Sequence, residues 1–162
     1  MANVIIEGIV ACFIVLIACV VGIANGPVNM VCLYEQEVQK RVIEKGLITE
    51  EKIKHNADLF RLFGMMPLII FIVVAVYGVN GARGFGEGFW QMTVIALMEG
   101  LFDRLFIDYY WVGKTKAWDI EGTEDLKPYI YGKSLAVKWL STVVGYPLIT
   151  ALIALIMSFI LK

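Results

Sequence analysis

Four charged residues stand inside one apolar stretch of the chain, and their types and spacing are those of a membrane-embedded binding site. They are Glu99, Asp103, Arg104 and Asp108. The stretch is bounded by Trp90 and Trp111, and tryptophan prefers the headgroup level of a bilayer. A charge at the bilayer centre costs about 2.5–3.5 kcal/mol, whereas each Leu, Ile, Phe or Val returns only about 0.3–0.6 kcal/mol. The four residues therefore need partners on neighbouring helices, and we predict that they bind a ligand or an ion.

Glu99 lies deepest of the four. At 1.5 Å per residue it is about 13 Å from one tryptophan and about 18 Å from the other, near the midplane of the bilayer. Ideal helical spacing places Arg104 one turn from Asp108, as an ion pair. The same spacing places Glu99 and Asp103 on another face, without a basic partner from their own helix. Two close carboxylates in a low dielectric should not both ionise, so we expect one to hold a proton, as in a proton or cation site.

The same pattern also fits a structural role for Glu99. A permanently protonated carboxyl could join two helices by donating to a polar side chain of the last apolar stretch. The candidates are Ser141, Thr142, Tyr146 and Thr150. Because a four-helix bundle is too thin to cover two polar faces of one helix, we also expect a homo-oligomer with one of the faces at its interface.

The composition places the whole chain in a membrane. It has 162 residues, of which 59% are hydrophobic, above the 45–50% of soluble domains. The 14 Lys and Arg nearly balance the 15 Asp and Glu, which excludes the basic surface of a nucleic-acid-binding protein. A single His, with neither a CxxC nor an HxxxH motif, argues against haem, a His/Cys zinc site and a dithiol relay. No metal or other cofactor is expected.

Four apolar stretches are long enough to cross the bilayer as helices. They lie at about residues 4–25, 60–79, 89–111 and 139–161. Eleven of the 14 Lys and Arg fall within residues 26–63 and 112–138, so the positive-inside rule predicts cytoplasmic connections at 26–59 and 112–138. The fold class is therefore all-α: a single transmembrane domain of residues 1–162, with four helices in a bundle and both termini outside.

The first long connection is expected to form a cytoplasmic helical hairpin between spans one and two. Residues 33–45 read as one helix, and Gly46 as its C-terminal stop. Thr49 is the N-cap of the next helix, which should run on into the second span, with a kink at Pro67. The hairpin either only links the two spans or also offers a docking surface to a protein partner.

The second long connection contains oxygen-bearing side chains at alternate positions, as at the start of a calcium-binding loop. An EF-hand needs Gly at its sixth position and Glu at its twelfth, whereas Glu124 and Ile130 stand there. We therefore expect a solvated acidic turn. The glycine-rich residues 80–88 follow an apolar stretch rather than a strand, which predicts a flexible turn and not a phosphate-binding loop.

The segments GARGFGEGFWQ and EGLFDRLFIDYYWVGKTKAWDIEGTEDLKPYI resemble a family of small, uncharacterised prokaryotic membrane proteins with four helices. That family has a signature of the form FDR...D...W...W..PGTED, and Glu121 stands here where the signature has proline. The resemblance implies a multi-pass protein of a bacterial-type plasma membrane. It implies no activity.

Three classes of function remain open. The first is proton- or cation-coupled transport, or the binding of a small ligand, at the charged residues. The second is an accessory subunit that docks through the hairpin. The third is a glutathione-using or lipid-modifying enzyme, because size and topology are similar to the glutathione-using membrane enzymes of eicosanoid metabolism. Their Arg-rich motif is replaced here by His55, Asn56, Asp58 and Arg61 in a different order, so an enzyme is the weaker prediction. The partners expected are the lipid bilayer and a second copy of the chain, with no nucleic acid.

Overall fold

The structure is a computed structural model that describes residues 1–161, and 81% of it is helix with no strand in this range. The α-helices are α1 Ala2–Ile23, α2 Gln36–Glu44, α3 Glu50–Phe60, α4 Met66–Val73, α5 Gly84–Phe102, α6 Gly132–Leu140 and α7 Tyr146–Ile160. Short 3-10 helices lie at Pro27–Leu33 and Glu124–Leu126. Stretches of π-helix continue several α-helices without a break, at Arg61–Met65, Val74–Val79, Asp103–Val112 and Ser141–Gly145.

Three helices are long and apolar enough to cross a membrane. They are Ala2–Ile23, Glu50–Val79 and Gly132–Ile160. The protein is therefore an all-helical membrane protein. The other expected span, residues 89–111, lies within the continuous helix formed by α5 and the π-helix that follows it. Its four charged residues make it too polar to count as a span by composition alone.

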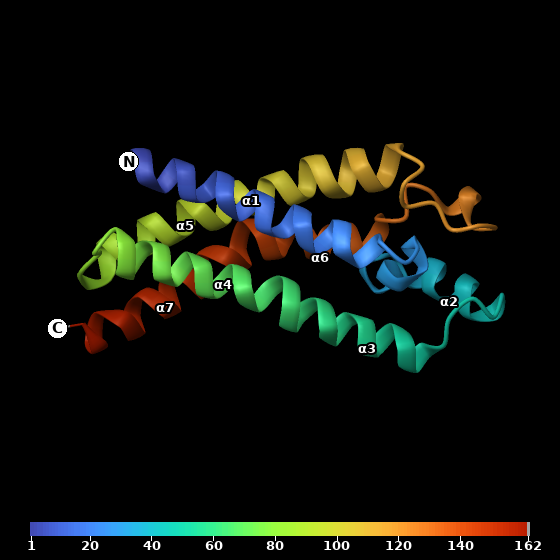
Figure 1. The fold of residues 1–162 in the computed structure, drawn as a ribbon, viewed down its shortest axis with the longest axis horizontal. Helices are drawn as coiled ribbons and strands as arrows, with labels where there is room; N and C mark the ends of the chain where they lie inside the picture. The colour runs from blue at the N-terminus through green and yellow to red at the C-terminus, as the bar shows by residue number, and fades with distance from the viewer. Residues whose placement is uncertain (162) are drawn as a thin grey trace.

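The long helices lie side by side, and α5 is the central one, because it packs against both α1 and α7 (Figure 1). Met92 and Ile95 of α5 are fully buried between these neighbours. Both ends of the chain and the turn between Val79 and Gly84 lie at one end of the bundle, and the two long connections lie at the other (Figure 1).

Two of the π-helical stretches have a local cause in proline. Pro67 stands at the start of α4 and Pro147 at the start of α7, each directly after a π-helical turn. Proline has no N–H and its ring clashes with the carbonyl four residues earlier, so a wider turn accommodates it without breaking the helix. The structure places a π-helical turn just before Pro67, and the kink expected at this proline stays a prediction.

The first long connection follows the expected order of elements with shifted boundaries. Its first helix is α2, which begins at Gln36 rather than at residue 33 because the 3-10 helix Pro27–Leu33 precedes it. Gly46 has a φ of 70°, which suits a glycine after a helix end. Thr49 caps the next helix by accepting a hydrogen bond from the Lys52 N–H at 3.3 Å. That helix continues through α4 to Val79, as expected.

The two long connections join into one compact unit, which we call the cap (residues 24–49 and 113–131). Tyr34, Trp118 and Tyr129 are fully or almost fully buried in it. The rings of Tyr34 and Tyr129 stack at 4.8 Å, and the Tyr34 hydroxyl donates to the Trp118 carbonyl at 3.1 Å. The expectation of a solvated acidic turn holds only in part. Glu121, Glu124 and Asp125 are exposed, but Asp119 is half-buried and paired with Lys127, and Trp118, Ile120 and Thr123 are buried.

Glu35 fastens the cap to the start of α6. Its carboxylate accepts a hydrogen bond from the Ser134 N–H at 2.9 Å, and this bond lowers the pKa of the Glu35 carboxyl. Its own N–H donates to the Tyr129 carbonyl at 2.9 Å. The first connection is therefore tied both to the second connection and to the helix that follows it.

Close approach of α5 to the helix of α6 and α7 depends on Gly100. A Cβ atom there would lie 2.7 Å from Thr142 Cγ2 and 2.8 Å from Tyr146 Cε2. We expect Gly100→Ala to lower the free energy of unfolding by about 1–2 kcal/mol, the usual cost of overpacking less the helix-propensity gain of alanine. Denaturation in a mild detergent measures this change. Gly86→Ala is the matched control, since no atom lies within 4 Å of its added Cβ, and equal effects of the two substitutions would contradict the close packing.

Candidate functional site

The structure brings the charged residues of the third apolar stretch into one buried cluster. The π-helix Asp103–Val112 sets their arrangement, because residues five apart share a face in a π-helix. Asp103 and Asp108 therefore lie on the same side. The Arg104 guanidinium forms ion pairs with both carboxylates.

The expectation of two opposite polar faces on this helix is wrong. It assumed 100° per residue throughout, whereas the helix widens at Asp103. Glu99, Arg104 and Asp108 are all buried within a single chain, and the Asp103 side chain is only 17% exposed. The need to cover a second polar face was the reason to expect a homo-oligomer. That reason does not hold, and self-association stays a prediction without it.

Lys138 of α6 is a member of the cluster that the sequence did not indicate. Its Nζ lies 2.9 Å from Asp108 Oδ1 and 3.2 Å from Asp108 Oδ2. Sequence reasoning counted Lys138 among the solvated lysines of the second long connection, one residue before the expected fourth span. A lysine near the end of a membrane span can extend its side chain along the helix toward a buried acid. The position of Lys138 in the sequence was therefore the one feature that could have indicated its role.

Glu99 is the one acid of the cluster that no Lys or Arg of the described residues pairs with. Glu99 is only 2% exposed, and its hydrogen-bond partner is the Tyr146 hydroxyl. Tyr146 is one of the four partners expected for a structural role. The cluster as a whole holds three acids and two bases, Arg104 and Lys138. One acid is therefore left without a compensating positive charge.

Two cavities flank the cluster. The larger, of about 220 Å³, lies between the helices and the cap, and its lining includes Asp103, Asp108, Lys138 and Trp118. The smaller, of about 80 Å³, lies between α4, α5 and α7, and Glu99 lines it. Met65 and Tyr146 line both cavities. The Tyr146 side chain, which is hydrogen-bonded to Glu99, therefore borders both cavities.

Two buried donors in the lining of the larger cavity have no hydrogen-bond partner within the described residues. They are Arg104 Nε and Trp118 Nε1. A buried donor without an acceptor costs about 1–3 kcal/mol. Each of the two donors could be satisfied by an oxygen atom of a bound polar solute or of a water molecule in the cavity.

The other sites considered from the sequence are not assembled in the structure. Within residues 1–161 no three His, Cys, Asp or Glu side chains are grouped so that they could hold a metal ion. Asp58 and Arg61, which stand where the glutathione-using enzymes carry their motif, form an exposed ion pair at 2.8 Å. Asn56 donates to the Asn29 carbonyl instead. These residues line neither cavity of the charged cluster.

Comparison with known proteins adds no relative. No family model, no curated protein and no solved structure matches the chain. The assignment of a site therefore rests on the geometry of the cluster.

The charge balance of the cluster can be tested through Arg104. Arg104→Met removes the partner of Asp103 and one partner of Asp108 in a buried setting, so we expect the free energy of unfolding to fall by about 3–5 kcal/mol. Chemical denaturation of the purified protein measures the loss. The matched control is Arg61→Met, because the Arg61–Asp58 pair is exposed and should contribute less than about 1 kcal/mol. A loss for Arg104→Met no larger than that of the control would contradict the cluster.

Proposed function

We propose that the chain crosses the plasma membrane four times, with the cap in the cytoplasm and both termini outside. The support for this topology is the distribution of charge. The end of the bundle that holds the cap also holds the lysines and arginines of both long connections, including Arg41, Lys45 and Lys127. The opposite end holds Arg83, and a positive excess marks the cytoplasmic side. The helix of residues 84–112 is then the third span in chain order, and it tolerates Asp103, Arg104 and Asp108 because they are paired inside the bundle.

Within this topology we infer that the protein exchanges a proton for a small monovalent cation, with Glu99 as the proton-carrying residue. The observation that carries the proposal is the excess of one buried acid over the buried bases, with Glu99 as the acid that has only a hydroxyl partner. A buried site with one uncompensated negative charge is costly, and either a proton or a cation removes that cost. The two would therefore compete for the same site.

The cavities supply a route to the site from two sides. The cavity under the cap reaches Asp103 and Asp108, and the cavity between α4 and α7 reaches Glu99. Tyr146 separates them and holds Glu99 through its hydroxyl. Rotation of one aromatic side chain would connect the two cavities when Glu99 changes its protonation state. This arrangement suits alternating access better than a permanent structural bond, which would not require a cavity on each side.

The test is proton movement in sealed proteoliposomes that contain a pH-sensitive dye. A gradient of sodium, potassium or tetramethylammonium is imposed, one probe at a time. We expect at least one of these cations to drive proton movement through the wild-type protein, because cation and proton share the excess acid. Glu99→Gln keeps the shape of the side chain but cannot exchange a proton, so its proton movement should fall to that of protein-free liposomes.

Asp58→Asn is the control, since it removes a carboxylate that is exposed on α3 and should transport like wild type. Exchange of one proton for one monovalent cation is electroneutral, so clamping the membrane potential should not change the rate. Proton movement that is equal in wild type and in Glu99→Gln for all three probes would contradict the proposal.

A further inference from the structure

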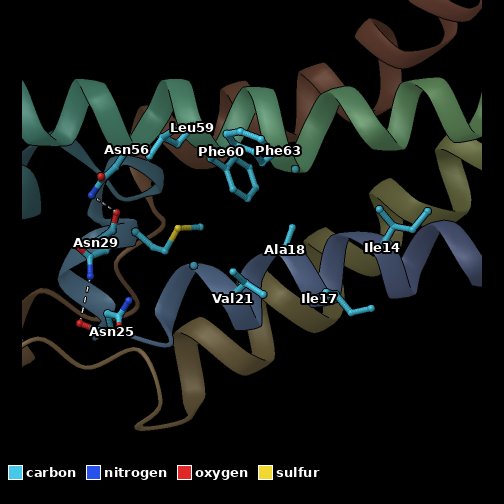
Figure 2. A pocket seen from close by; sticks show the side chains of 13 residues that line it. Ile14, Ile17, Ala18, Val21, Asn25, Asn29, Asn56, Leu59, Phe60 and Phe63 are labelled. Atoms are coloured by element: carbon cyan, nitrogen blue, oxygen red, sulfur yellow. Dashed lines mark hydrogen bonds between the residues drawn. The ribbon is translucent and has the colours of Figure 1, made fainter.

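A second feature, independent of Glu99, is a long groove on the surface of the bundle between α1 and the helix of α3 and α4. Its volume is about 700 Å³. Ile17 and Val21 of α1 line one side, and Phe60, Phe63 and Gly64 line the other. The Phe60 ring points toward α1, and Ala18 of α1 points back toward it (Figure 2).

The groove is polar at one end only. Asn25, Asn29 and Asn56 lie together at the end next to the cap (Figure 2). The Asn56 Nδ2 group donates to the Asn29 carbonyl at 2.9 Å, and the Asn29 Nδ2 group donates to the Asn25 carbonyl at 3.1 Å. Their Oδ1 atoms remain as acceptors, and the Asn25 carboxamide makes no hydrogen bond within residues 1–161. The Asn25 carboxamide therefore offers its Oδ1 atom as an acceptor and its Nδ2 group as a donor, so that a ligand's hydroxyl can donate to it and a ligand's carbonyl can accept from it.

The length of the groove matches one leaflet of a bilayer. From Ile14 to the end of α1 at Ile23 it runs for about 14 Å at 1.5 Å per residue. Half of a hydrocarbon core of about 30 Å is about 15 Å. The asparagines then lie at the boundary between hydrocarbon and headgroups, on the side of the cap.

The groove is also uncharged. None of the residues that line it is Asp, Glu, Lys, Arg or His. Arg61 follows Phe60 in the chain, but it is exposed and paired with Asp58 at 2.8 Å. A phosphate-bearing headgroup would need a basic side chain at the polar end, and carboxamides instead suit uncharged groups that carry hydroxyl and carbonyl oxygens.

We propose that this groove binds one molecule of an uncharged, hydroxyl-bearing glycerolipid from the leaflet on the side of the cap. An acyl chain lies along Ile17, Val21 and Phe63, and the free hydroxyl donates to the Asn25 carboxamide oxygen and accepts from a carboxamide NH2 group. Diacylglycerol has this chemistry. The lipid would cover the open surface above the place where Gly64 of the second span packs against Ala18 of α1.

The test is native mass spectrometry of the protein in mild detergent, with an equimolar mixture of diacylglycerol, phosphatidylcholine and phosphatidylglycerol that carry identical acyl chains. We expect one diacylglycerol to be retained per chain in preference to both phospholipids. Asn25→Leu should weaken retention about tenfold, the effect of losing one hydrogen bond to an otherwise apolar site. Ala18→Phe should abolish retention, because the new ring fills the groove.

Val20→Phe is the matched control on the same helix and at the same depth, since Val20 is exposed but does not line the groove. It should retain diacylglycerol like wild type. Because Asn25→Leu changes an exposed side chain, it keeps the test decisive even where Ala18→Phe fails to fold. Three results would overturn the proposal: phosphatidylglycerol retained as well as diacylglycerol, equal retention by Asn25→Leu and wild type, or a lipid-free dimer that Ala18→Phe dissociates.

Discussion

The ion pairs of Arg104 are the interaction on which the rest of the structure depends. A guanidinium inside the bundle requires carboxylates at both ends of its planar group, and Asp103 and Asp108 supply them. That requirement places the helix of residues 84–112 in the centre of the bundle, where other helices exclude lipid. The same ion pairs also help to position the cap, because Trp118 and Tyr34 of the cap line one cavity together with the two acids. The ion pairs of Arg104 and the buried aromatic core of the cap are therefore parts of one arrangement.

Much of the fold follows from the hydropathy and the capping residues. Three of the four long apolar stretches, the stop at Gly46 and the N-cap at Thr49 are present where residue type and spacing predict them. The details of the site were harder to predict, because they depend on helical pitch. A single value of 100° per residue cannot show that the helix widens at Asp103, nor that Lys138 reaches back to Asp108. The cap depends on aromatic contacts between residues far apart in sequence, such as Tyr34 and Tyr129, for which no local pattern exists.

The bundle holds two sites of different chemistry. The acids of the helix of residues 84–112 are enclosed and lie against two small cavities. The groove between α1 and the helix of residues 50–65 is open, apolar and uncharged, with carboxamides only at its end (Figure 2). Phe60 lines both the open groove and the cavity under the cap. A lipid in the groove would therefore contact the Phe60 ring, which also lines the charged cavity. Through this ring, occupancy of one proposed site would affect the other.

The proposed transport requires Glu99 to exchange its proton in the folded protein. Infrared difference spectroscopy of the protein in lipid nanodiscs, between about pH 5 and about pH 9, observes this directly through the carbonyl band of a protonated carboxylic acid. We expect this band to be lost and a carboxylate band to be gained as the pH rises, and we expect Glu99→Gln to show neither change. A carbonyl band that persists at the higher pH in wild type, and is missing from Glu99→Gln, would mean that Glu99 keeps its proton and serves only to join two helices.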